Sequence, residues 1–287
     1  MSEKIAFIAD SCADLPQQVL DLDNVFRIPV VVSCGGKDYL DGVEITAEAV
    51  YQEQDKGGLP STSLPSGDLV TKTLAEVAQK GYDKAVLITM SSAISGTWNF
   101  CRLMCAECET PECIVVDATM ASLAQGALLV ELRDEVEAGT LHWADIPARI
   151  EVLKQKTKPY FGIDTLEFLQ KNGRVGKATA VAGNLLNIMP ILSFDEKGVI
   201  DSVEKVRGKK KRMARLKEMA LEQIARHKRY RLYFVSGGCP EMMDELRQSI
   251  LAESDPNVEI MTSELGCALA AHLGRNLVGV CVQGLDD

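Results

Sequence analysis

The sequence has few aromatic residues, few histidines and no long uncharged segment. Aromatic residues make up 5% of its 287 residues, and it contains three histidines. No stretch without a charged residue exceeds 17 residues, and one of that length, 178–194, includes two asparagines and a proline, so it is too short and too polar to cross a bilayer. Five apolar residues between Lys4 and Asp10 are too few for a secretory signal. We therefore expect a cytoplasmic protein without stable membrane insertion, whose nine cysteines are reduced thiols.

The common motifs for nucleotide binding and hydrolysis are also absent. The sequence has no GxxxxGK[ST], GxGxxG, HExxH or GxSxG, and GRVGK at 173–177 lacks the spacing of a phosphate-binding loop. These absences argue against a self-contained nucleotide site, a zinc protease and an α/β-hydrolase. We expect neither a cofactor nor a metal.

Net charge excludes one class of partner and points to another. The formal charge is −10, from 31 basic and 41 acidic residues, which argues against nucleic acid as a partner. Residues 205–231 differ, because they contain 12 Lys or Arg and two acidic residues. Such a segment is often only a solvated face. Its other interpretation is a docking surface for an acidic protein or for phosphate groups.

In the first half of the chain, apolar runs alternate with helical stretches, as in a parallel α/β sheet. Caps predict helices after Thr46 and Ser66, and Asp14 is the expected cap of a helix starting at Gln17. A long helix is expected from about Ser122 to near Gly139. Gly35-Gly36 predicts a turn into a second strand around Tyr39. The runs expected to form strands are 4–10, 25–33, 83–90 and 113–117.

In the second half, a hairpin precedes alternating helices and strands, which suggests a mixed sheet with helices on one face. The hairpin turns at 195–198, and a helix is expected over 178–189. The other expected strands are 160–164, 231–236, 258–262 and 278–282. The fold class is α/β, with a Rossmann-like N-terminal domain (1–157, with a hairpin-containing excursion at about 30–60) and a mixed-sheet C-terminal domain (158–287).

Candidate ligand-binding residues gather where the predicted strands of the first half end. Ligands of open α/β sheets bind beyond the carboxyl ends of strands. These loops are rich in hydroxyls, which can hold a carboxylate or a phosphate, although Ser and Thr also simply cap helices. The hydroxyl candidates are Ser11, Thr62, Ser63, Ser92 and Ser95. His272 lies in an apolar run and is either a core residue or part of this site.

A cysteine cluster offers a competing interpretation. Cys101, Cys105 and Cys108 have the spacing of an iron–sulfur motif of radical enzymes. The same spacing places three small apolar residues on one face of the helix expected after Thr97. We favour packing, because cluster ligands usually need a loop that wraps the metal.

Several segments together resemble the DegV family, the bacterial fatty-acid-binding proteins. They occur in the family's order and cover essentially the whole chain. The segments are IAFIADSCADLP (5–16), DYLDGVEIT (38–46), PSTSLPS (60–66), SSAISGTWN (91–99), DTLEFLQKNGRVGKA (164–178), LLNIMPILSF (185–194), VEKVRGKKK (203–211) and SELG (263–266), followed by His272.

The resemblance implies a non-catalytic lipid-binding protein with a tunnel between two α/β domains. It places a long-chain fatty acid there, with its carboxylate on Thr62, Ser95 and His272. The stretches 121–132 and 178–189 are candidate tunnel walls. Arg174 and Arg207 match family arginines near the site or the partner face.

The same resemblance implies a partner, a separate fatty-acid kinase subunit that makes an acyl phosphate. We expect this kinase to contact the basic cluster of Arg207, Lys209, Lys210 and Lys211. Two alternatives stay open: a stand-alone enzyme, which would use the cysteines or Ser95 with His272 for acyl transfer, and a protein that binds a non-lipid anion.

Overall fold

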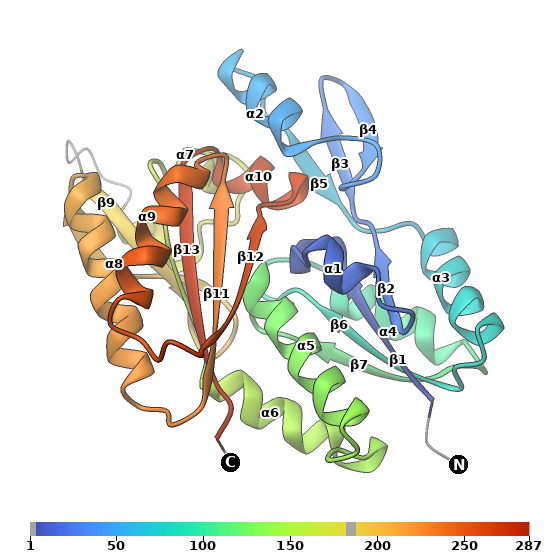
Figure 1. The fold of residues 1–287 in the computed structure, drawn as a ribbon. Helices are drawn as coiled ribbons and strands as arrows, with labels where there is room; N and C mark the ends of the chain where they lie inside the picture. The colour runs from blue at the N-terminus through green and yellow to red at the C-terminus, as the bar shows by residue number, and fades with distance from the viewer. Residues whose placement is uncertain (1–3, 182–187, 287) are drawn as a thin grey trace.

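The computed structural model describes residues 4–181 and 188–286. Its two large β-sheets lie side by side, with helices between and around them (Figure 1). The N-terminal sheet is fully parallel, in the order β2-β1-β6-β7. Its strands are β1 (Ile5–Asp10), β2 (Val25–Ile28), β6 (Lys84–Thr89) and β7 (Glu112–Asp117). Every residue of β1 is buried, as its unbroken apolar run predicts for a central parallel strand.

Helices cover both faces of this sheet. On one face α3 and α4 pack over a core that includes Ile8, Leu74 and Leu87, and on the other face α5 packs against β1 and β6. Ser66 caps α3 by accepting a hydrogen bond from the Leu69 amide. The helices of this half are η1 (Ser11–Ala13), α1 (Gln17–Leu20), α2 (Ala47–Asp55), α3 (Gly67–Gln79), α4 (Thr97–Ala106), α5 (Leu123–Glu137), η2 (Trp143–Asp145) and α6 (Ile146–Lys156).

A small antiparallel sheet follows β2 and carries part of the site. Its order is β4-β3-β5, from strands β3 (Val31–Cys34), β4 (Lys37–Leu40) and β5 (Ser61–Ser63). The single strand expected over 25–33 is wrong, because the chain breaks at Pro29, which has no amide hydrogen for a ladder. The turn lies at Gly35 and Gly36, whose φ angles of 57° and 77° favour glycine.

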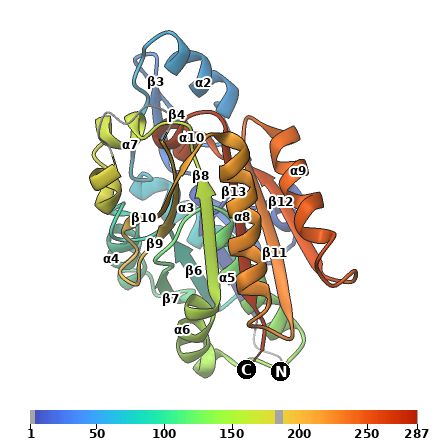
Figure 2. The same cartoon turned by 90° about the vertical axis from the view of Figure 1, so that its left-hand side faces the viewer.

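The C-terminal sheet is mixed, in the order β10-β9-β8-β13-β11-β12. Helices α8 and α9 cover one face of it (Figure 2), while its other face is turned toward α5 and α6. The strands are β8 (Thr157–Gly162), β9 (Ile188–Phe194), β10 (Ile200–Arg207), β11 (Tyr230–Gly237), β12 (Glu259–Glu264) and β13 (Leu277–Gly284). The helices are α7 (Glu167–Lys171), η3 (Gly176–Val181), α8 (Lys209–Ile224), α9 (Pro240–Leu251) and α10 (Cys267–Leu273). The α/β class and the parallel and mixed sheets are thus confirmed; the boundary at 157 stays a prediction.

Two further local expectations differ from the structure. Asp14 does not cap α1, because its carboxylate is bound elsewhere and α1 begins after Pro16 without a side-chain cap. The helix expected over 178–189 is a 3₁₀ turn up to Val181, its residues 182–187 lie outside the described ranges, and Ile188 already belongs to β9. No helix within residues 4–181 and 188–286 is long and apolar enough to cross a membrane.

Candidate functional site

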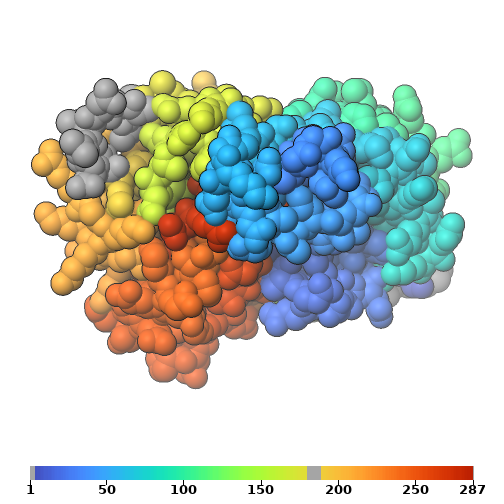
Figure 3. Space-filling view, turned by 90° about the horizontal axis from the view of Figure 1, so that it is seen from above, coloured from blue at the N-terminus to red at the C-terminus, as the bar shows by residue number. Residues whose placement is uncertain are grey.

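A cavity of about 300 Å³ lies between the two large sheets. Residues from both halves of the chain line it, and most of the lining is apolar. Helix α10 closes one end, where it packs against α2, α7 and β5. Seen from above in Figure 3, α10 (red) is framed by the yellow-green surface around residue 170 and the blue surface of α2. A cavity with an apolar body and few polar groups is typical of a small-molecule site.

The polar groups of the cavity are concentrated near α10. Strand β5 places Thr62 there, the turn before α4 places Ser95, and α10 itself carries His272. Ser63 and the exposed Arg174 also line this end. The structure therefore brings together five of the predicted ligand-binding residues from four distant segments of the sequence.

Thr62 and His272 form the central contact of this polar end. The Thr62 hydroxyl lies 2.9 Å from Nε2 of His272, although the two residues are 210 positions apart. Burial, and to a smaller extent the nearby Arg174, lowers the pKa of His272 to about 4. The imidazole is therefore neutral at pH 7, with one nitrogen that donates and one that accepts.

Two groups beside this contact have hydrogen-bonding capacity left for a ligand. Nδ1 of His272 is buried and has no partner in the described part of the chain. The Ser95 hydroxyl lies 2.8 Å from the Thr97 hydroxyl and accepts from the Thr97 amide. Since buried polar groups are usually paired, the free nitrogen indicates that this end is built for a polar ligand.

Beyond the polar end, the cavity runs along the inner face of the C-terminal sheet. On β13 its lining extends from Leu277 to Cys281, four residue steps that span about 13 Å. The start of α5 contributes Leu123 and Ala124 to the opposite wall. Of the two predicted walls, the first residues of 121–132 line the cavity, whereas residues 182–187 of the second, 178–189, fall outside the described ranges.

Two of the predicted hydroxyls do not line the cavity. Ser92 is exposed, and its amide donates to Asp117. The Ser11 hydroxyl is buried, where it donates to Asp41 at 2.7 Å and accepts from the Val30 amide at 3.1 Å. The donor and one acceptor site of the Ser11 hydroxyl are therefore occupied within the protein.

Two carboxylates near Ser11 accept hydrogen bonds from the start of α10, a role that was not predicted from the sequence. Asp14 accepts a hydrogen bond of 2.8 Å from the Gly266 amide, and Asp41 accepts one of 3.2 Å from the Ala268 amide. Both amides belong to the first turn of α10, where a carboxylate is favourable. Burial raises the pKa of neighbouring Asp10 to about 6. Asp14 and Asp41 thus orient the helix that carries His272.

The cysteine cluster belongs to the hydrophobic core. Cys101 and Cys105 on α4 are buried against β6 and α3, and burial raises the pKa of Cys101 to about 12. The helix ends at Ala106, so Cys108 lies beyond it and donates to the Thr110 carbonyl. Within residues 4–181 and 188–286, no group of His, Cys, Asp and Glu side chains could hold a metal ion.

A serine–histidine pair for acyl transfer is not formed either. Among the described residues, Ser95 bonds with Thr97 and His272 with Thr62, and no hydrogen bond joins Ser95 to His272. No carboxylate in this part of the chain contacts His272 to orient it as a base. The arrangement lacks the contacts that activate a serine.

Five of the 12 Lys and Arg residues in the basic segment 205–231 form ion pairs, which reduces the cationic surface that could contact a partner. Arg212 is fully buried and bonds to Asp164 at 3.0 Å, and Arg215 pairs with Glu204 and two acids of its own helix. Arg231 is also buried and paired. Exposed cations lie at both ends of α8, and the basic cluster lies at its start, where Lys209 contacts Asp164 at 3.0 Å.

The lowered pKa of His272 predicts a pH-dependent stability for the ligand-free protein. Because the folded state holds the ring neutral, its contribution is complete above pH 6.5 and is lost as the pH falls toward 4, by up to about 3 kcal/mol. Urea unfolding of the wild type and of His272→Asn at pH 7 and pH 4 measures this contribution. Groups that titrate in both proteins cancel when the free energy of unfolding of one is subtracted from that of the other. A difference between the two proteins that does not change with pH would contradict it.

Comparisons with known proteins agree with this architecture. A family model described as "Uncharacterised protein, DegV family" matches residues 4–284. Protein DegV of Bacillus subtilis is 31% identical over 96% of this chain and 98% of its own, and a DegV domain-containing protein of Streptococcus pneumoniae is 30% identical over the same shares.

Solved structures of the family are also similar. A DegV family protein from Thermus thermophilus, described by its fatty acid binding, has a TM-score of 0.92 at 31% identity and covers 98% of this chain and 100% of its own. DegV of Bacillus subtilis, described as a fatty acid binding protein, has a TM-score of 0.88 at 29% identity, with 99% and 100% covered. The family match over nearly the whole chain and these similarities lead to one conclusion: this chain belongs to the DegV family.

Proposed function

We propose that this protein binds one long-chain fatty acid in the cavity, with the carboxylate at Thr62, Ser95 and His272. The observation that carries the proposal is an apolar cavity with two hydroxyls and a neutral, partly unpaired imidazole at one end. Fatty acid binding by the relatives from Thermus thermophilus and Bacillus subtilis supports it.

The two ends of the cavity have different tasks in binding. At about 0.8 kcal/mol per buried CH₂, a palmitoyl tail offers on the order of 10 kcal/mol of gross stabilisation, and ordering the chain offsets part of it. Hydrogen bonds to a charged carboxylate add about 1.5–3 kcal/mol each. The tail therefore supplies most of the affinity, and the polar end selects the acid over an uncharged lipid.

Isothermal titration of delipidated protein with palmitate and with hexadecanol tests this division. The two ligands share their tail and differ in the head group. We expect palmitate to bind at least about tenfold more tightly, which corresponds to one charge-assisted hydrogen bond. Equal affinities would contradict carboxylate recognition, and binding of neither ligand would contradict the proposed function.

We also propose that the bound carboxylate is presented to a separate fatty-acid kinase subunit, which makes the lipid-binding protein itself non-catalytic. The polar end borders the surface, because Ser63 and Arg174 line it and are exposed. The basic cluster lies at the same edge of the molecule. Asp164 links the two, since it contacts Lys209 at 3.0 Å and Asn276, four residues after His272, at 3.0 Å.

Neutralising the basic cluster should separate presentation from binding. In a variant with Arg207, Lys209, Lys210 and Lys211 all changed to Gln, we expect acyl-phosphate formation with the kinase to fall at least about tenfold, because complementary charges speed association. Lipid content should not change, since none of these side chains lines the cavity.

The matched control neutralises exposed cations at the other end of α8, with Arg226, Lys228 and Arg229 changed to Gln. With this control variant, acyl-phosphate formation by the kinase should equal that with the wild type. Undiminished acyl-phosphate formation by the first variant would remove the proposed docking role of the basic cluster.

A further inference from the structure

The inner face of the C-terminal sheet meets the cavity in successive rows of residues. The strand register pairs Val235 of β11 with Gly279 of β13, and Gly279 with Phe161 of β8. All three residues line the cavity. A Cβ at Gly279 would lie 2.6 Å from a Val235 methyl group, so glycine at this position keeps the row open.

The next row on the same face also lines the cavity. It consists of Tyr233, Cys281 and Pro159, again paired across the three strands. Tyr233 and Cys281 are 1% and 4% exposed, so this row lies deep in the molecule. It is also the row farther from α10, because β13 enters the sheet at Leu277, directly after that helix.

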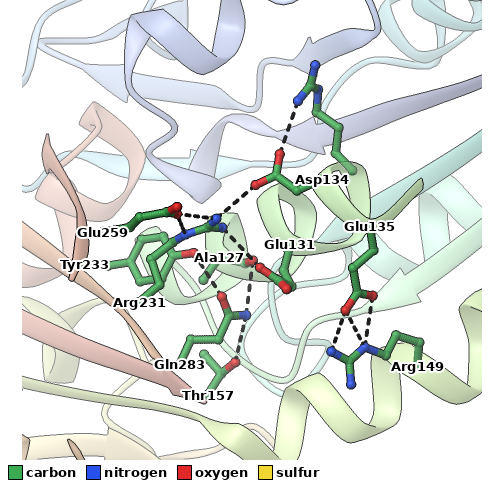
Figure 4. A network of polar contacts seen from close by, with 11 residues as sticks. Ala127, Glu131, Asp134, Glu135, Arg149, Thr157, Arg231, Tyr233, Glu259 and Gln283 are labelled. Carbon is green, nitrogen blue, oxygen red and sulfur yellow. Dashed lines mark hydrogen bonds and ion pairs between the residues drawn. The ribbon is translucent and has the colours of Figure 1, made fainter. Parts of the chain in front are cut away.

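The third row is polar, unlike the two rows before it, and it does not line the cavity. Its members are Arg231, Gln283 and Thr157. All three are buried and bonded, as Figure 4 shows. Gln283 donates to the Ala127 carbonyl of α5 and to the Thr157 hydroxyl, both at 3.2 Å, so the row joins the sheet to α5.

Tyr233 connects the last apolar row to the polar one. Its hydroxyl donates to Oε1 of Gln283 at 2.9 Å. Burial raises the pKa of Tyr233, so the hydroxyl keeps its proton and remains a donor. An alkyl chain that advanced further would have to separate buried, paired polar groups without replacing their hydrogen bonds, which is unfavourable.

We propose that the polar row Arg231–Gln283–Thr157, together with Tyr233, forms the end of the acyl tunnel and limits the length of the fatty acid. Tyr233 and Cys281 are then the residues that determine chain-length specificity. This inference rests on the proposed fatty-acid binding, and it deepens that proposal by naming where the methyl end of the ligand stops.

The size of the expected effect follows from the spacing of the rows. Two residues of a strand advance about 7 Å, and an extended alkyl chain advances about 1.3 Å per bond. One row therefore corresponds to roughly five methylene groups. A side chain that is enlarged or trimmed in the last apolar row should shift the preferred length by about two to four carbons, since it fills part of that row.

Native mass spectrometry of delipidated protein, incubated with an equimolar mixture of saturated acids from laurate to arachidate, measures the preferred length. We expect Cys281→Leu to shift the bound acids to shorter chains and Tyr233→Val to shift them to longer ones. Phe234→Val and Val282→Leu are the matched controls, because both residues face α8 and α9 on the other side of the sheet. The controls should retain the wild-type distribution.

The possible results separate the two proposals. Wild-type distributions for Cys281→Leu and Tyr233→Val would overturn the assigned tunnel end, and so would equal shifts in the controls. If Tyr233→Val does not fold, Cys281→Leu alone decides. If the wild type binds none of the acids, the proposed function itself fails.

Discussion

The double variant Thr62→Ala/Ser95→Ala should lose its bound fatty acid, with an affinity for palmitate at least about a hundredfold below that of the wild type. Ser95 is expected to donate to the carboxylate, and Thr62 is expected to donate to Nε2 of His272, which places the proton on Nδ1 as the second donor. A hydrogen bond to a charged group contributes about 1.5–3 kcal/mol. Two such bonds correspond to a hundredfold or more. Isothermal titration of delipidated protein with palmitate measures the change.

Ser92→Ala is the matched control for this experiment. Ser92 lies in the same loop as Ser95, but it is exposed and does not line the cavity. Its affinity for palmitate should equal that of the wild type. The same affinity in the double variant would contradict the assigned carboxylate site while leaving binding of the tail intact.

The second large effect concerns stability. Arg231→Ala should lower the free energy of unfolding by about 3–5 kcal/mol, the usual cost of removing one partner of a buried ion pair. Arg231 contacts Glu131 at 3.2 Å and Asp134 at 3.0 Å on α5, and it also pairs with Glu259 (Figure 4). Burial raises the pKa of Glu131, although Arg231 opposes this, so the variant would leave a poorly solvated carboxylate. Urea unfolding at pH 7 measures the difference.

Two further variants distinguish the effect of breaking the buried ion pair of Arg231 from the effect of removing an arginine as such. Arg215→Ala removes an ion-paired arginine near the surface, whose side chain is 27% exposed, and it should cost about 1 kcal/mol or less. Adding Glu131→Gln to Arg231→Ala should restore part of the lost stability, because the stranded charge is removed. A loss below about 1 kcal/mol for Arg231→Ala would show that this pair does not hold α5 to the C-terminal sheet.

Most of the helices and strands could be predicted, because the residues that specify each of them lie within it or next to it in the sequence. The apolar run of β1, the Ser66 cap of α3 and the Gly35-Gly36 turn each specify their element within a few residues. Errors arose where a distant contact decided the outcome. Asp14 is typical of a helix cap, yet its carboxylate is bound by Ser122 and the Gly266 amide, from segments far along the chain.

The candidate site shows the same limit. Resemblance to a family brought Thr62, Ser95 and His272 together, whereas spacing alone could not have joined residues 210 positions apart. Ser11 was included because its loop ends a strand, but Asp41, 30 residues later, occupies its hydroxyl. The last row of the cavity needed the strand register, because Tyr233 and Cys281 become neighbours only in the antiparallel pairing of β11 and β13.

Native mass spectrometry of the protein purified from a bacterial host, followed by organic extraction, tests the central claim most directly. The proposed function predicts a mass increment equal to one long-chain fatty acid, and the same acid in the extract. Protein that is free of lipid and does not take up fatty acid when it is supplied would contradict it. Lipid-free protein that carries iron would favour a metal enzyme instead.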